Sequence, residues 1–242
     1  MIIQIFENAD QVAKAGANLV AAQLLEDPQS VLGLPTGSTP IGVYDQLIRL
    51  YEDGVISFAE TTTFNLDEYL GLSKDNDQSY YHFMLEHLFS QVNVQAENIN
   101  IPDGTVDDPV AECERYEQAI AEAGGMDLQL LGLGRNGHIG FNEPDSFFQK
   151  ATHVVELTEN TINANARFFA DPDQVPRQAL SMGIGTIMDA AKIILVATGS
   201  SKAEAVKAMV EGNIDPLCQA SILQLHPSVT ILLDRDAAAL LS

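Results

Sequence analysis

The chain has 242 residues and a formal net charge of −22, from 12 Lys and Arg against 34 Asp and Glu. Nucleic-acid phosphates and anionic membranes repel so acidic a protein, which excludes both as default partners. Hydrophobic residues make up 46% of the sequence and charged residues 19%, so the chain can bury a core and is not expected to be disordered.

Apolar or β-branched runs predict strands at residues 2–6, 31–34, 61–66, 126–133, 153–157, 192–198 and 229–233. Amphipathic stretches between most of them predict helices at residues 10–26, 40–51, 78–89, 109–123 and 201–211. The runs at 128–133 and 193–197 are apolar almost throughout, which is typical of strands covered on both faces. We therefore predict an α/β fold, doubly wound and Rossmann-like, with a mainly parallel sheet and helices on both faces.

No linker, repeat or low-complexity tract divides the sequence, so we expect one domain over residues 1–242. No apolar stretch has the length of a membrane span, and residues 1–10 lack the pattern of a secretory leader, so we expect a cytoplasmic protein. Cys113 and Cys218 lie far apart without CxxC spacing. They are expected to be buried thiols, with no disulfide framework or zinc cluster.

Ligands of open parallel sheets bind beyond the carboxyl ends of the strands, so the loops there are informative. In the first, residues 33–40, Gly37 frees the backbone, Ser38 or Thr39 can cap a helix, and Pro40 fits its first position. Free amides at such a helix start suit a phosphate. An ordinary strand-to-helix turn is the alternative, since the loop lacks the Lys of a Walker A motif.

Two later loops carry candidates for proton transfer. Asp67 and Glu68 follow an apolar strand, where burial raises a carboxyl pKa, so either is a candidate general base; the alternative is a carboxylate that caps the next turn. The loop at residues 132–144 combines glycines with Asn136, His138 and Glu143, which favours a site over a merely structural histidine.

Two cations complete the candidates. Arg167 precedes two phenylalanines, and Lys202 is predicted in the first turn of a helix, where it opposes the helix dipole unless an anion binds there. A solvated surface cation is the alternative. In a chain with so few basic residues, an anionic substrate depends on a few local cations.

Three motifs together resemble those of glucosamine-6-phosphate deaminases: Leu-Pro-Thr-Gly-Ser-Thr-Pro at 34–40, Phe-Asn-Leu-Asp-Glu-Tyr-Leu-Gly-Leu at 64–72, and Gly-Leu-Gly-Arg-Asn-Gly-His-Ile-Gly-Phe-Asn-Glu-Pro at 132–144. The resemblance extends through the segments at 79–84, 166–169, 174–176 and 223–227, and so covers nearly the whole chain. It implies conversion of the phosphosugar glucosamine 6-phosphate to fructose 6-phosphate and ammonia, with no cofactor or metal.

By motif position, the resemblance makes Asp67 the base that moves a proton from C2 to C1, and His138 the group that opens the sugar ring, held by Glu143 and Asn136. A carboxylate and an imidazole in separate loops suit two successive proton transfers. The phosphate is expected on Gly37, Ser38, Thr39, Arg167 and Lys202.

The sequence departs from the family pattern at two places. Many members have Asp at the position of Asn136, and a neutral amide cannot stabilise an imidazolium as an anion does. Allosteric members have basic residues after Asn-Glu-Pro and a longer C-terminal tail, whereas residues 153–156 here read His-Val-Val-Glu. We therefore expect a monomer or small homo-oligomer, not a hexamer activated by N-acetylglucosamine 6-phosphate.

Other functions fit less well. A 6-phosphogluconolactonase shares the fold and the glycine-rich histidine loop, but usually has Arg at the position of Tyr69. A non-catalytic sugar-phosphate sensor is expected to add a basic DNA-binding segment and to lose its base or histidine. His138 and Glu143 alone, without a third candidate ligand, are poor evidence for a zinc site.

Overall fold

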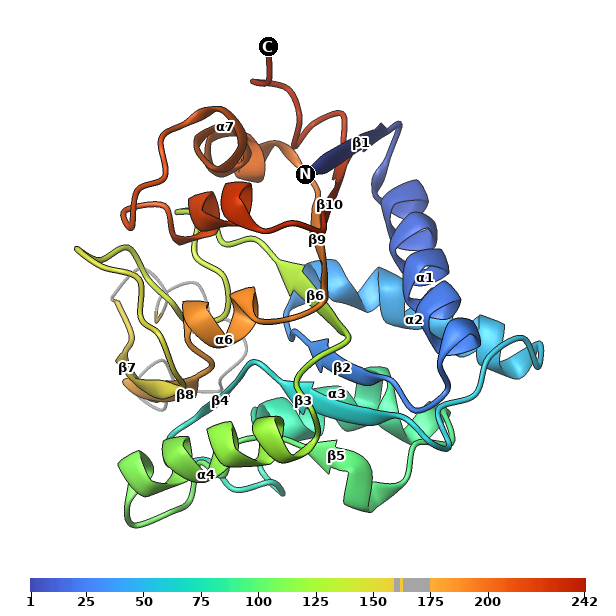
Figure 1. Cartoon of the computed structure of the whole chain (residues 1–242), viewed down its shortest axis with the longest axis vertical. Helices are drawn as coiled ribbons and strands as arrows, with labels where there is room; N and C mark the ends of the chain where they lie inside the picture. The colour runs from blue at the N-terminus through green and yellow to red at the C-terminus, as the bar shows by residue number, and fades with distance from the viewer. Residues whose placement is uncertain (159–161, 163–174) are drawn as a thin grey trace.

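The computed structural model describes residues 1–158, 162 and 175–242. Within these residues, the centre is a sheet of seven strands in the order β1-β10-β9-β6-β2-β3-β5, with every neighbouring pair parallel (Figure 1). The strands are β1 (Ile2–Phe6), β2 (Val31–Leu34), β3 (Thr62–Asn65), β5 (Ile99–Asn100), β6 (Leu128–Gly132), β9 (Lys192–Ala197) and β10 (Val229–Asp234). The predicted α/β fold with a mainly parallel sheet is confirmed.

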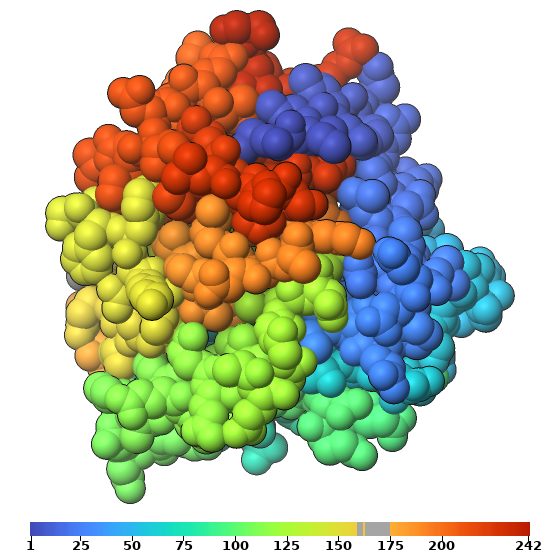
Figure 2. All heavy atoms as spheres, in the orientation of Figure 1, coloured from blue at the N-terminus to red at the C-terminus, as the bar shows by residue number. Residues whose placement is uncertain are grey.

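The order of the strands reverses between β2 and β6. From β2 the chain proceeds outward to β3 and β5, then returns to β6 on the other side of β2 and proceeds outward through β9 and β10. The edge strand β1 pairs with β10, so the two ends of the chain meet on one side of the molecule (Figure 2). Ligands of doubly wound sheets bind outside the carboxyl ends at such a reversal, so the loops after β2 and β6 are where a site is expected.

Helices cover both faces of the sheet. On one face lie α1 (Ala9–Glu26), α2 (Ser38–Glu52) and α3 (Tyr80–His87), and on the other α4 (Pro109–Glu122), α6 (Ile184–Met188) and α7 (Ala203–Glu211). Short 3₁₀ turns occur at Phe89–Gln91, Ala96–Asn98, Ser200–Lys202 and Gln219–Leu225. In β9, Ile193 and Leu195 enter one core while Ile194 and Val196 enter the other. Burial on both faces explains why the central strands are apolar without alternation.

A second, antiparallel sheet stands beside the first. Its order is β4 (Asp67–Tyr69), β8 (Gln178–Ser181) and β7 (His153–Glu156). The sequence predicts β7 but misses β4, β5, β8 and α6, which have only two to five residues each. The consequence for the site is that Asp67 belongs to a strand and pairs with Ser181, instead of lying in a free loop.

Two predicted helix starts are wrong. Helix α2 begins at Ser38 and is capped by Gly37, so neither Ser38 nor Thr39 caps it by its side chain, and Pro40 is its third residue. The reason is the φ of 96° at Gly37, which turns the chain one step earlier than a side-chain cap would. Helix α7 begins at Ala203, so Lys202 ends the preceding 3₁₀ turn and is not in the first turn of the helix.

Candidate active site

The loop after β6 brings together Asn136, His138 and Glu143. The Asn136 Nδ2 donates a hydrogen bond to Glu143 Oε2 over 2.7 Å, and the His138 Nδ1 lies 3.5 Å from the same oxygen. The His138 backbone N–H donates to Asn136 Oδ1 over 3.3 Å. Glu143 is therefore the group that faces the imidazole, while Asn136 holds the carboxylate and the backbone of His138. A carboxylate beside one ring nitrogen orients the ring and stabilises its protonated form.

Glycine makes this loop possible. The imidazole of His138 lies so close to Gly134 that a Cβ there would come within 2.4 Å of the ring. The loop is closed by a hydrogen bond of 2.9 Å from the Gly134 N–H to the His138 carbonyl. Any side chain at position 134 would push the imidazole out of its place beside Glu143.

Ser181 joins the strand of Asp67 to the histidine loop. Its backbone pairs with Asp67 in the antiparallel sheet, and its Oγ accepts a hydrogen bond of 3.0 Å from the Phe141 N–H. A Cβ built on Gly140 would lie 3.1 Å from Ser181 Oγ and 3.6 Å from Asp67 Oδ2. The Asp67 carboxylate therefore lies against the loop that carries His138, although the two residues are 71 positions apart in the sequence.

The Asp67 carboxylate is held in an unusual electrostatic state. The residue is only 6% exposed, and its Oδ1 has no hydrogen-bond partner. Burial, and after it the neighbouring charge of Glu68, raises the pKa of Asp67 to about 8. Glu68 instead accepts three backbone N–H groups, two of them at the start of α3, and so takes the capping role that was the alternative for this pair. Of the two carboxylates, Asp67 is the one that keeps an oxygen without a hydrogen-bond partner.

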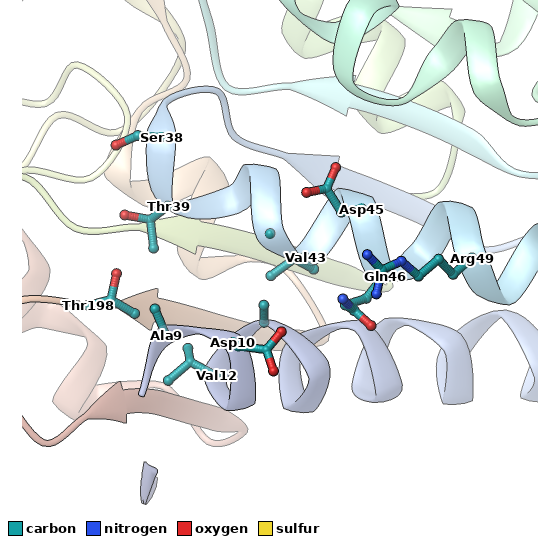
Figure 3. Close-up of a pocket in the computed structure, with 12 residues that line it drawn as sticks. Ala9, Asp10, Val12, Ser38, Thr39, Val43, Asp45, Gln46, Arg49 and Thr198 are labelled. Atoms are coloured by element: carbon teal, nitrogen blue, oxygen red, sulfur yellow. The ribbon is translucent and has the colours of Figure 1, made fainter. Parts of the chain in front are cut away.

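The start of α2 lines a cavity of about 310 Å³ between α1 and α2 (Figure 3). Ser38, Thr39 and Thr198 lie at one end of it, and Arg49 lies at the other. None of the four predicted catalytic residues lines this cavity. The N-cap of α2 is Gly37, so no side chain at that position accepts a hydrogen bond from the first amides of the helix.

Lys202 reaches from that loop to the end of β6. Its Nζ donates to the Leu133 carbonyl over 2.6 Å, and burial, followed by the charge of Arg135, lowers its pKa. No ion pair is formed by Lys202 or Arg135 within the described part of the chain. Arg135 is not among the residues predicted from the sequence to bind the phosphate. An arginine beside glycines, in a chain with so few cations, could have indicated it. The predicted Arg167 lies outside the described residues.

Residues 1–158, 162 and 175–242 hold no group of three His, Cys, Asp or Glu side chains that could bind a metal ion. In the same ranges no helix is long and apolar enough to cross a bilayer. Cys113 and Cys218 are both free thiols, the first buried and the second half-buried.

Comparison with known proteins bears on this arrangement. Residues 6–231 match the model of the family described as glucosamine-6-phosphate isomerases/6-phosphogluconolactonase. Glucosamine-6-phosphate deaminases from Alkaliphilus oremlandii and Clostridium novyi are each 53% identical, over 241 and 239 residues, with at least 99% of both chains covered.

Comparison with solved structures indicates the same family. A monomeric glucosamine-6-phosphate deaminase, described as a missing link of the NagB superfamily, has a TM-score of 0.97 and 48% identity, covering 99% of this chain and 100% of that one. A 6-phosphogluconolactonase from Leishmania guyanensis has a TM-score of 0.78 at 22% identity, covering 100% and 98%, and so shares the fold. The chain belongs to the glucosamine-6-phosphate isomerase/6-phosphogluconolactonase family.

Proposed function

We propose that this protein is an enzyme that converts glucosamine 6-phosphate and water to fructose 6-phosphate and ammonia. The observation that carries the proposal is the pairing of a buried carboxylate, Asp67, with an imidazole, His138, that lies beside the carboxylate of Glu143. Asp67 is on strand β4 and His138 is in the loop after β6, and Ser181 contacts both segments. Full-length relatives at about half identity carry the name of this activity.

The chemistry divides between these groups. His138 moves the proton of the anomeric hydroxyl to the ring oxygen, which opens the ring, and Glu143 stabilises the imidazole while it carries that proton. Asp67 then takes the proton from C2 and returns it at C1. Water adds at C2 and the amino group leaves as ammonia, so one water is consumed for each ammonia released.

Purified, chelator-treated protein is expected to release ammonia and form fructose 6-phosphate in equal amounts from glucosamine 6-phosphate. The same preparation offered 6-phosphogluconolactone should show no hydrolysis above the spontaneous rate. Folded protein that leaves glucosamine 6-phosphate unchanged contradicts the proposal, and lactone hydrolysis in that case points to the other activity of the family.

We infer that the substrate phosphate binds between the start of α2 and Lys202, with Gly37, Ser38, Thr39, Arg135 and Arg167 as further contacts. Lys202→Met is expected to raise KM for glucosamine 6-phosphate by about tenfold or more with kcat little changed, because a charged hydrogen bond is worth roughly 1.5–3 kcal/mol. Arg135→Gln should raise KM less, since Arg135 is exposed. Lys207→Met is the matched control, because Lys207 pairs with Glu211 on the next helix. Equal KM values for Lys202→Met and Lys207→Met would remove Lys202 from the site.

We propose that a single chain is the working unit and that N-acetylglucosamine 6-phosphate does not activate it. The structure most relevant to this point, at 48% identity, is of a protein described as monomeric. A mass near 26.2 kDa in solution and a hyperbolic rate curve would support this.

We also propose a cytoplasmic location, since the two free thiols suit a reducing compartment.

A further inference from the structure

Glu68, the neighbour of Asp67, is a buried carboxylate to which the proposed reaction assigns no step. It is 3% exposed. Its Oε1 accepts hydrogen bonds from the backbone N–H groups of Tyr69 (2.8 Å) and Tyr80 (3.0 Å), and its Oε2 accepts one from Tyr81 (3.0 Å). The acceptor sites that it would otherwise offer to water are thus taken by backbone amides.

These bonds complete the start of α3. An α-helix begins with four N–H groups that have no partner within the helix. In α3 these groups are those of the N-cap Ser79, which donates to the Asn76 carbonyl, of Tyr80 and Tyr81, which donate to Glu68, and of His82, which donates to the Ser79 hydroxyl. Ser79 alone provides the local cap, whereas Glu68 ties the helix to strand β4. The positive end of the helix dipole favours an anion at this position.

Asp67 and Glu68 are consecutive in β4, so their side chains leave the strand on opposite faces. The hydrogen bonds of Glu68 to α3 therefore hold the strand that carries Asp67. Three buried phenols, of Tyr44 on α2, Tyr80 on α3 and Tyr116 on α4, lie within the electrostatic reach of Asp67: burial raises the pKa of each of them, and the charge of Asp67 contributes to the rise. The charge that raises the pKa of Asp67, after burial, is that of Glu68, a group of the same sign.

The surroundings of Glu68 keep it charged when Asp67 titrates. Burial, with a smaller contribution from the charge of Asp103, raises the pKa of Glu68 to about 7, and the three amide donors oppose that rise. Hydrogen bonds from Thr105, and after them the charges of Lys74 and Arg115, lower the pKa of Asp103. Because Glu68 accepts three backbone N–H groups whereas the Oδ1 of Asp67 has no hydrogen-bond partner, Glu68 is the carboxylate that holds the negative charge more readily.

We propose that Glu68 is a positioning residue of the reaction: clamped as an anion by three backbone N–H groups, it fixes the base Asp67 against α3 and sets a like charge beside it. This inference rests on the proposed function, because it gives Asp67 the role of base. The fixed negative charge of Glu68 makes the Asp67 carboxylate a stronger base toward the weakly acidic C–H proton. The same charge restricts activity at low pH, because Asp67 is then protonated over more of the pH range.

The test is the pH profile of kcat/KM for ammonia release. Glu68→Gln is expected to move the acidic limb to lower pH by about one unit, and to lower the plateau rate, because Asp67 becomes a weaker base. Glu68→Asp keeps the negative charge, but its shorter side chain bonds the amides of α3 less well. The acidic limb of this variant should therefore stay at the parental pH while kcat falls. Ser79→Ala removes the other cap of the same helix and should lower Tm without moving the limb.

A limb of Glu68→Gln that coincides with that of the parent would overturn the proposal, as would an equal shift in Glu68→Asp or Ser79→Ala. Carbon-13 NMR titration of the Asp67 carboxyl in the parent and in the two Glu68 variants gives the same comparison without turnover. A parent that shows this coupling but releases no ammonia would refute the proposed function and leave the electrostatic role of Glu68 standing.

Discussion

Asp67→Asn is expected to abolish ammonia release and at the same time to make the protein more resistant to heat at pH 9. The first effect follows from the loss of the group that takes the C2 proton. General bases contribute roughly 10²–10⁴-fold, so the residual rate should lie between about one hundredth and one ten-thousandth of the parental rate. Asparagine preserves the shape of the side chain in its strand, so the fold should not change.

The gain in stability follows from proton linkage. Burial raises the pKa of Asp67 from 3.8 to about 8 in the folded chain. Between these two pH values the folded protein holds a proton that the unfolded chain has released, so unfolding releases a proton and stability falls as pH rises through this window. Above pH 8 the cost reaches its full value, with an upper bound of about 6 kcal/mol at about 1.36 kcal/mol per pH unit. Asparagine carries no such cost.

Thermal unfolding of the parent and of Asp67→Asn at pH 6 and pH 9 measures this effect. The difference in Tm between the two proteins should grow by several degrees from pH 6 to pH 9, since roughly 1 kcal/mol shifts Tm by about 2–4 °C at this chain length. Asp75→Asn removes an exposed carboxylate from the loop before α3 and should show the same Tm as the parent at both values. A difference that is the same at both pH values would show that Asp67 does not ionise with the expected cost, and a catalytic rate near that of the parent would remove it as the base.

The sequence predicts those parts of the fold and the site whose interacting residues lie close together in the chain. The parallel sheet was predictable because β6 and β9 are apolar on both faces, which few other structures require. The rule that ligands gather at carboxyl ends then placed the loops after β2 and β6 at one edge. Within the second of these loops, Asn136, His138 and Glu143 lie within seven positions of one another, so their meeting was also predictable from the sequence.

The remaining features depend on contacts between residues far apart in the chain. Strand β4 consists of Asp-Glu-Tyr, a composition that predicts a loop, and becomes a strand only because β8 arrives from more than a hundred positions away. The same holds for Lys202, whose partner is a carbonyl 69 positions earlier. The roles of Asp67 and Glu68 could not be separated by sequence, because only the position of α3 decides which carboxylate accepts its amides.

The second large effect concerns the negative charge beside His138. Glu143→Gln is expected to lower kcat by about 100-fold, because the imidazole loses the anion that lies 3.5 Å from its Nδ1 and stabilises it while it carries a proton. Asn136→Asp alone should have the opposite electrostatic effect. It places a second carboxylate at the position of the amide that lies 2.7 Å from Glu143 Oε2, and the added negative charge near the ring is expected to move the pH optimum of kcat upward.

The double variant Asn136→Asp/Glu143→Gln separates charge from position. It keeps one carboxylate and one amide at the same two sites and reverses the hydrogen bond between them, so the number of charges near His138 equals that of the parent. If the charge is what matters, the double variant should regain at least about tenfold of the kcat lost by Glu143→Gln, which corresponds to about 1.4 kcal/mol of the activation free energy. Losses that simply add would mean that the carboxylate must stand at position 143 to align the ring.

An unchanged pH profile in Asn136→Asp would show that the imidazole does not respond to charge from this side. The asparagine at position 136 makes the comparison possible, because Glu143 is then the one carboxylate of this pair, with its Oε2 3.5 Å from the ring nitrogen Nδ1.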